Sequence, residues 1–345
     1  LGNVMGGLRA LMVASKLGGT TLTTFGDHAS MKKVANMLGL SYTKSILPEY
    51  MKQLKQGATR DEALRFGLGI NEMAGSMTRF GDADIVSSAT KSGRFNARMQ
   101  AFAATTMKLS GLNAVTAGAK RALNLVHMNK LAEMTRKTDW KDLGADDLKI
   151  LQGNGITERD WQLWQQLEPS KREDGTAVLS QNDFFNAPDD VIKQFLPLDK
   201  QDNANALADF RYKAAMKYQT HIFNEESVAI IEAGVRERSI INLGEAGTIQ
   251  GELGRTLFQF KGFPLAYMFR IGHRAFAQGD IKSRVTFLAS LLAYQTLAGA
   301  LIVQTQNLAN GKNPEPVFTI DFFGKSLLKG GGLSFLGDIM SALSD

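Results

Sequence analysis

Four histidines and the lack of cysteine limit the metal and nucleophile chemistry open to this chain of 345 residues. Without cysteine, the sequence excludes a disulfide scaffold, a thiolate metal site and a cysteine nucleophile. His221 and Glu225 stand one helical turn apart, a spacing that can set two metal ligands on one helix face. The same spacing is common in an ordinary pair at the edge of a core, which is the interpretation we favour. The histidines are His28, His127, His221 and His273.

Phosphate-binding and acid–base motifs are incomplete in this sequence. The Gly-Lys segments at 118–120 and 311–312 lack the spacing of a Walker A loop. Glu226-Ser227 is similar to the Glu-Ser pair of lytic transglycosylases, but the Gly-Leu-Met-Gln sequence expected downstream is missing. We therefore expect Glu226 to be an ordinary helix residue. The segment is predicted not to be an enzyme, with no catalytic residue, cofactor or metal.

A stretch at 254–284 mixes phenylalanines with basic residues. A basic and aromatic amphipathic helix of this kind is typical of a unit that lies at a membrane interface. A core helix with basic flanks is the alternative, and both interpretations stay open. The candidate contact residues are Phe258, Phe260, Lys261, Phe263, Phe269, Arg270 and Arg274.

The next segment, 285–303, is free of charge and reads VTFLASLLAYQTLAGALIV. As a helix these residues rise about 28 Å, close to the hydrocarbon thickness of a bilayer. Lys282 and Arg284 flank one end, as membrane anchors would. The alternative is the buried central helix of an all-α domain, which Gln295 and Thr296 favour. The candidate contact residues here are Leu288, Leu291, Leu292, Leu297 and Leu301.

Helical periodicity extends over most of the remaining chain, which has 34 glycines but only 7 prolines. Long helices are predicted over 95–134, 203–240 and 250–278. Met31, Val34, Ala35 and Leu38 form a shorter apolar stripe that Gly39 closes, and Thr59 with Glu62 predicts a capping box. We therefore expect an all-α, elongated assembly of long helices.

The middle of the chain differs in texture and holds all three tryptophans. Thr157 is expected to begin a short helix, and Pro188 another. Asp174-Gly175 predicts a tight turn that leads into a brief strand at 177–179. We interpret 139–200 as a small compact insert that packs on the longer helices.

The distribution of charge also distinguishes the middle of the chain from the rest. Residues 1–138 contain 19 basic and 8 acidic side chains, whereas 139–209 contain 7 basic and 15 acidic ones. The predicted divisions are a basic helical region at 1–138, the acidic insert at 139–200, and long helices at 201–345 with the basic-aromatic and apolar segments. A basic surface suits DNA, anionic lipid or an acidic partner.

Leu257-Phe258-Gln259-Phe260-Lys261-Gly262-Phe263 resembles the Gln-Phe-Lys-Ser-Phe motif of a phage protein family, with Gly262 in place of serine. The family is that of the large internal virion, or DNA-ejection, proteins of short-tailed bacteriophages. The order of the elements also resembles the C-terminal part of these proteins: a helical opening, an acidic insert, the motif helix and an apolar helix. The match covers most of the chain, and only the motif is specific.

The resemblance implies a structural subunit that is stored in the capsid at the portal and released into the host envelope before the genome. There, homo-oligomers together with a second, smaller core protein are expected to form a conduit for phage DNA across the periplasm and inner membrane. A lytic transglycosylase domain at the N-terminus of the parent protein is outside these residues. Because the sequence begins with Leu1 rather than Met, we expect a piece of a longer chain.

Two other classes of function stay open. One is an enzyme module that acts on peptidoglycan or nucleic acid, and the other is an autonomous membrane pore former. Degradation of peptidoglycan by the chain alone would favour the first, and leakage of vesicles without a partner would favour the second.

Overall fold

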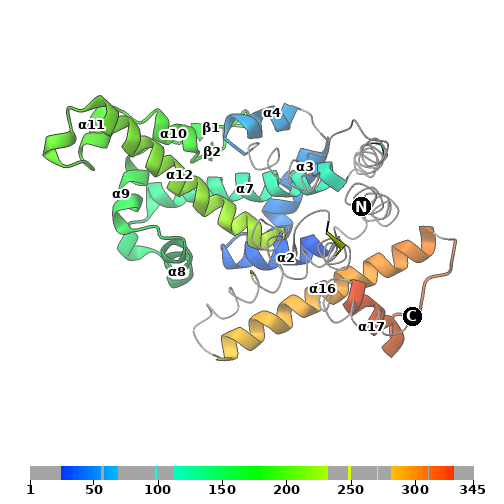
Figure 1. The fold of residues 1–345 in the computed structure, drawn as a ribbon. Helices are drawn as coiled ribbons and strands as arrows, with labels where there is room; N and C mark the ends of the chain where they lie inside the picture. The colour runs from blue at the N-terminus through cyan, green and yellow to red at the C-terminus, as the bar shows by residue number, and fades with distance from the viewer. Residues whose placement is uncertain are drawn as a thin grey trace. The chain divides into compact units, whose positions relative to one another are not determined.

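The computed structural model describes residues 25–55, 58–68, 98, 112–231, 248–249, 270, 281–309 and 311–329 (Figure 1). Eleven α-helices and one two-stranded hairpin lie within these residues, so the predicted all-α fold class is confirmed. The helices are α2 (Phe25–Met37), α3 (Leu47–Lys55), α4 (Ala58–Arg65), α7 (Leu112–Lys137), α8 (Ala145–Gly153), α9 (Glu158–Gln166), α10 (Gln181–Phe185), α11 (Asp189–Lys193), α12 (Ala204–Ala229), α16 (Ile281–Ala309) and α17 (Ile320–Lys329). A π-helical turn at Tyr42–Ile46 and two 3₁₀ turns at Trp140–Asp142 and Leu198–Lys200 complete the helical elements.

The described residues belong to two compact units. The first, which we call the core unit, comprises 34–55, 58–68 and 117–226. The second comprises 25–33, 98, 112–116, 227–231, 248–249, 270, 281–309 and 311–329. We call it the hairpin unit, after the helical hairpin that α16 and α17 form. The core unit contains the acidic segment 139–200 together with parts of the basic region. The division of the chain into three parts, which is based on charge, therefore stays a prediction.

Aromatic side chains fill the centre of the core unit, between α7, α9, α10 and α12. Trp164 is 2 % exposed, and its ring lies 5.1 Å from that of Tyr218 in an edge-to-face arrangement. Trp161 is fully enclosed and donates from Nε1 to the Thr138 carbonyl at 3.1 Å. Large rings of this kind bury much apolar area and still satisfy their polar atoms. The predicted packing of the acidic segment on longer helices is therefore observed.

Local signals in the acidic segment form the expected structures. The Thr157 hydroxyl accepts from the Asp160 amide at 3.4 Å while Asp160 Oδ2 accepts from the Thr157 amide at 2.7 Å, which makes a capping box at the start of α9. Gly175 takes a φ of +82°, which favours glycine, and joins the strands β1 (Ser170–Lys171) and β2 (Ala177–Val178). Pro188 stands directly before α11. Two of these short elements contact the long helices: Asn129 of α7 donates to the Ala177 carbonyl at 2.8 Å, and Lys217 of α12 pairs with Asp160 at 2.5 Å.

A buried ion-pair network connects three separate parts of the core unit. The Arg172 guanidinium, which is 7 % exposed, reaches Glu49 Oε1 and Glu62 Oε2, each at 2.9 Å. Glu62 also accepts from the Glu173 amide at 3.0 Å. Buried arginine is stable where carboxylates neutralise it and accept its hydrogen bonds. The network therefore ties α3 and α4 to the β1–β2 hairpin.

Three helix predictions need comment. The capping box at Thr59 is wrong, because α4 begins before that residue, at Ala58, and Glu62 instead binds Arg172. The helix predicted over 203–240 ends at Ala229, where a bend at Ile230 interrupts it. The helix predicted over 250–278 lies outside the described residues apart from Arg270, and of the one predicted over 95–134 only Arg98 and α7 are described.

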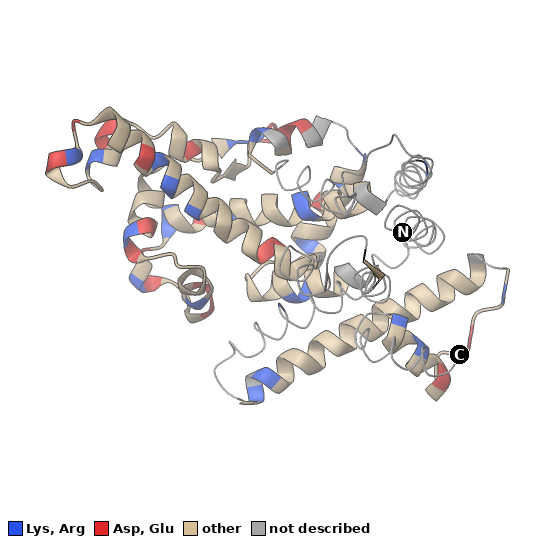
Figure 2. Cartoon of the chain, viewed as in Figure 1, with Lys and Arg blue, Asp and Glu red and all other residues tan. Residues whose placement is uncertain are grey.

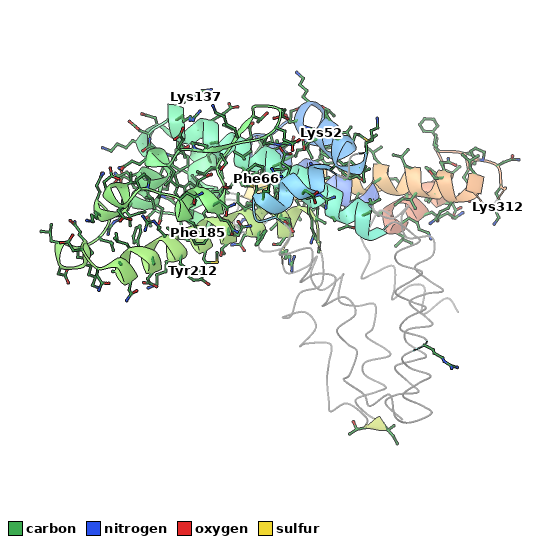
Figure 3. The ribbon with its side chains drawn as sticks, turned by 90° about the horizontal axis from the view of Figure 1, so that it is seen from above. Lys52, Phe66, Lys137, Phe185, Tyr212 and Lys312 are labelled. Atoms are coloured by element: carbon green, nitrogen blue, oxygen red, sulfur yellow. The ribbon has the colours of Figure 1, made fainter. Side chains whose placement is uncertain are left out.

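The burial of side chains tests the apolar stripe predicted at 31–38. Met31, Val34, Ala35 and Leu38 are all buried, so the stripe predicted for α2 is confirmed. Two large side chains of the core unit, Phe185 and Tyr212, point outward (Figure 3).

Candidate membrane and partner contact surface

The apolar helix predicted near the C-terminus is the longest element described. α16 has 29 residues, which corresponds to about 43 Å of helix. Within it, Arg284–Leu308 is long and apolar enough to cross a bilayer, with a mean hydropathy of 1.7, and only 33 % of this apolar window is buried in the protein. The only charged side chains on α16 are in its first turn (Figure 2). Length, composition and exposure together make α16 the leading candidate for a contact with lipid.

One stripe of α16 faces the protein. Phe287, Leu291, Gln295, Ala298 and Ile302 follow each other at three- and four-residue steps, and none is more than 8 % exposed. This is the spacing of one face of an α-helix. This stripe is the longest buried row of side chains on α16.

The other faces of α16 are also apolar, but they point outward. Val285 is 59 % exposed, Leu297 65 % and Leu301 60 %. A helix of a soluble protein usually turns polar residues outward, and a helix that is hydrophobic all round is usually surrounded by protein or lipid. After the first turn, which holds the exposed Ile281, the other exposed large apolar side chains of α16 are Leu288, Leu292 and Leu308. We call the six named residues that follow the first turn the outer face.

α17 packs against α16 and makes a helical hairpin with it. Gln304 fastens the connection: its Nε2 donates to the Glu315 carbonyl at 2.6 Å, and its Oε1 accepts from the Glu315 amide at 2.9 Å. Lys325 pairs with Glu315 at 3.0 Å and Asp321 at 2.7 Å. The bonds from Lys325 and Asn307 lower the pKa of Glu315. The connection thus keeps charged groups together at one end of α16.

α17 also carries exposed apolar side chains. Ile320 is 93 % exposed and Phe323 57 %, while Phe322 on the opposite side is buried. Phe318, just before α17, is fully exposed. Both helices of the hairpin therefore expose large apolar side chains.

Two lysines of α2 contact the first half of α16. Lys33 Nζ donates to Ser290 Oγ at 2.6 Å and lies 4.9 Å from the centre of the Phe287 ring. Lys32 Nζ lies 4.5 Å above the centre of the Tyr294 ring. Burial lowers the pKa of Lys33. This contact was not predictable, since two lysines in a short helix carry no signal for a partner more than 250 residues away.

The contact residues predicted from the sequence are divided by the structure. Leu288, Leu292, Leu297 and Leu301 point outward, whereas Leu291 is 1 % exposed and faces the protein. Nη1 of Arg270 donates to the Ser227 carbonyl at 2.9 Å. The predicted residues Phe258, Phe260, Lys261, Phe263, Phe269 and Arg274 lie outside the described residues.

Glu226, the residue of the incomplete transglycosylase pair, lies in the interior of the core unit. It is 3 % exposed, pairs with Lys120 at 3.3 Å and accepts from Asn124 at 2.5 Å. A carboxyl group that acts as an acid in glycoside cleavage must reach its substrate. The described contacts of Glu226 instead join α12 to α7.

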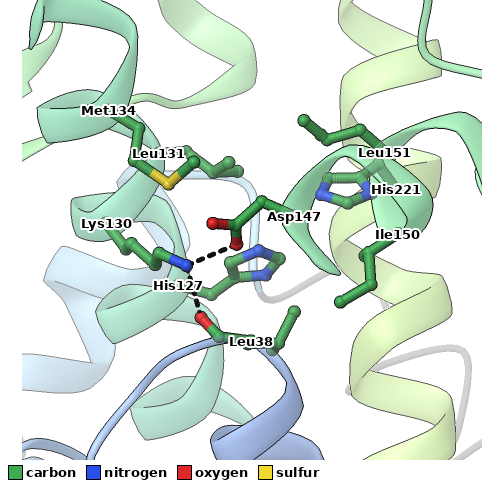
Figure 4. Close-up of a pocket in the computed structure, with 9 residues that line it drawn as sticks. All are labelled: Leu38, His127, Lys130, Leu131, Met134, Asp147, Ile150, Leu151 and His221. Carbon is green, nitrogen blue, oxygen red and sulfur yellow. Dashed lines mark hydrogen bonds and ion pairs between the residues drawn. The ribbon is translucent and has the colours of Figure 1, made fainter. Parts of the chain in front are cut away.

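His127 and His221 form a second buried polar group between α7 and α12 (Figure 4). Their ring centres are 5.2 Å apart, beside a cavity of about 10 Å³, which is room for one water molecule at most. Lys130 closes the cavity with bonds of 2.6 Å to Asp147 and to the Leu38 carbonyl. Burial lowers the pKa of His127 well below 6.5, and the neighbouring His221 and Lys130 lower it further.

The pair His221 and Glu225 was considered above as two metal ligands. Glu225 Oε1 accepts from Asn154 Nδ2 at 2.8 Å. Among the described residues, no three His, Asp or Glu side chains are grouped closely enough to hold a metal ion.

Comparison with known proteins adds no relative. No family model matches the chain, and neither a curated protein nor a solved structure matches it.

Proposed function

We propose that this chain is a structural subunit of a phage DNA-ejection apparatus and that the α16–α17 hairpin contacts the host inner membrane. One observation supports the membrane contact above all: apolar side chains surround α16, yet only 33 % of its apolar window is buried in the protein. The motif at 257–263 supports the phage context. On this proposal the chain resides in the virion before infection and in the host periplasm and inner membrane afterwards.

The ends of α16 suit the two headgroup layers of a bilayer. Lys282 and Arg284 precede the apolar stretch, and the next charged residue is Lys312. The helical part between these charges, 285–309, rises about 37 Å, which exceeds the hydrocarbon thickness and is accommodated by tilt. Exposed apolar surface of this size favours lipid over water by the hydrophobic effect.

The polar side chains of α16 are compatible with lipid around its outer face. Both amide atoms of Gln304 are bonded to the Glu315 backbone. Gln295 is 2 % exposed and lies in the stripe that faces the protein. Polar residues in membrane helices usually face neighbouring protein in this way.

A line of small residues along α16 suits contact with a second chain. Ala289, Ala293, Thr296 and Ala300 follow one another at three- and four-residue steps, and each is exposed or half-buried. Small residues at this spacing let helices approach closely in lipid. In the proposed apparatus the neighbour is another copy of the chain or the second core protein, around a conduit through which phage DNA passes.

Two arginine substitutions at adjacent positions test the membrane contact. Leu292 is 38 % exposed, so Leu292→Arg should stay folded in buffer but lose insertion into anionic vesicles, at a cost of about 2.5–3.5 kcal/mol at the bilayer centre. Leu291 is 1 % exposed, so Leu291→Arg should instead destabilise the hairpin unit in buffer. Leu198→Arg, at an exposed position of the core unit, is the control and should change neither property. Circular dichroism and vesicle flotation measure the two effects.

Insertion of Leu292→Arg at the wild-type level would refute the membrane contact. The phage context has a separate test: mass spectrometry should find the chain in full virions and show its loss from particles that have released their DNA. Degradation of peptidoglycan by the isolated chain would contradict a purely structural role, and vesicle leakage without a partner would favour an autonomous pore.

A further inference from the structure

The contacts between α2 and α16 fall on the part of α16 that would lie in the hydrocarbon. Phe287, Ser290 and Tyr294 occupy successive turns of α16, and each touches an ammonium group of Lys32 or Lys33. Counted from Arg284, these turns lie about 5 to 15 Å along the helix axis. The last of them is near the middle of a bilayer that α16 spans.

Charged lysine side chains are strongly disfavoured at the middle of a bilayer. Each charge at the bilayer centre lowers insertion by about a hundredfold. The two side chains are also fixed on α16 by a hydrogen bond and by ring contacts, and cannot reach a headgroup while those contacts remain. Packing of α2 on α16 and spanning by α16 are therefore mutually exclusive.

We propose that α2 is a clamp that keeps α16 in its soluble position, and that anionic lipid headgroups release it by taking over Lys32 and Lys33. This inference rests on the proposed membrane function. In the closed form the two ammonium groups have a neutral hydroxyl and two ring faces as partners. A phosphate or carboxylate headgroup binds an ammonium group more strongly than these neutral partners, because the hydrogen bond is then charged on both sides.

A reversible cross-link tests the clamp directly. The chain has no cysteine, so Lys33→Cys with Ser290→Cys gives a single reactive pair that a short, cleavable bis-maleimide can join. We expect the cross-linked full chain to float with anionic vesicles, after an alkaline wash, at least tenfold less than the uncross-linked variant. Cleavage of the linker should restore flotation. Lys52→Cys with Asp174→Cys, at an exposed ion pair of the core unit, is the matched control and should float equally before and after cleavage.

The outcomes separate the clamp from the membrane function. Equal flotation of the cross-linked and cleaved forms would refute the clamp and leave the membrane function intact. Failure of both forms and of the wild type to float would refute the membrane function and the clamp with it.

Charge variants provide a second test that needs no cross-link. Lys32→Gln with Lys33→Gln should insert several-fold faster than the wild type, because the clamp is weakened. Lys44→Gln with Lys55→Gln removes the same charge from exposed positions, and should insert no faster, since it only weakens attraction to anionic lipid. Equal rates for the two double variants would overturn the proposal.

Discussion

Acidification should destabilise the core unit through His127. Its ring is 3 % exposed, between α7 and α12, and burial holds its pKa well below 6.5, with smaller effects of His221 and Lys130. The charged groups around the histidine pair are Lys130 and Asp147, which pair with each other, and Glu225, which accepts from Asn154. An unfolded histidine takes up a proton near pH 6.5. Below that pH the unfolded state binds more protons than the native state, so stability falls as the pH falls.

The size of the effect follows from this linkage. For each pH unit below 6.5 at which His127 remains neutral in the native state, the free energy of unfolding decreases by about 1.4 kcal/mol. Between pH 7.5 and pH 5 the loss from this one group is at most about 2 kcal/mol. That is a large share of the 5–15 kcal/mol by which domains are typically stable.

Urea unfolding of the wild type and of His127→Phe, measured from pH 7.5 to pH 5, tests the argument. Tryptophan fluorescence reports on the core unit alone, because Trp140, Trp161 and Trp164 all belong to it. With falling pH, the free energy of unfolding should decrease more steeply in the wild type than in the variant, by up to about 1.4 kcal/mol per pH unit. Both proteins keep His28, whose pKa burial also lowers, so its contribution cancels. Equal slopes in the two proteins would refute the reasoning.

Three further predictions concern single positions. Arg172→Met should cost about 3–5 kcal/mol in urea unfolding, because two carboxylates stay buried without their partner; a cost under about 1 kcal/mol would contradict this. Gly67→Ala should lower the melting temperature, since Gly67 has a φ of +79° and a Cβ there would lie 2.5 Å from the Gln181 side chain. Gly324→Ala should instead stabilise α17 by about 0.5–1 kcal/mol, because a Cβ in this helix meets no described atom within 4 Å; thermal unfolding measures both glycine variants, and a change of the same sign in both would contradict the argument.

Signals confined to a few neighbouring residues were readable from the sequence. Thr157 with Asp160 and the Asp174-Gly175 turn formed as expected, because their hydrogen bonds join residues only a few positions apart. The apolar stripe of α2 is buried as its helical spacing predicts. Thr59 and Glu62 show where a prediction from the local sequence fails. Glu62 has the spacing of a capping box, but Arg172 offers it a charged, buried partner that the local pattern does not reveal.

The apolar helix shows a second limit. The absence of charge over 285–303 predicted a long helix, but did not distinguish Leu291, which faces the protein, from Leu292, which faces outward. That difference is tertiary, and the described partners of α16, which are α2 and α17, are distant in sequence or lie beyond the apolar stretch. Periodicity gives no help, because apolar residues occupy all sides of α16.

The ion pair between Glu62 and Arg172 also has a consequence for synthesis. The two residues are 110 positions apart, and Ala63 of α4 and Phe66 directly after it belong to the same core as Trp164. At about 5–20 residues per second, a ribosome needs roughly 5 to 20 s to add that stretch. During this time α4 has left the exit tunnel and its apolar side has no cover. We therefore expect nascent chains halted between these positions to bind chaperones, and to be released once the β1–β2 hairpin has emerged.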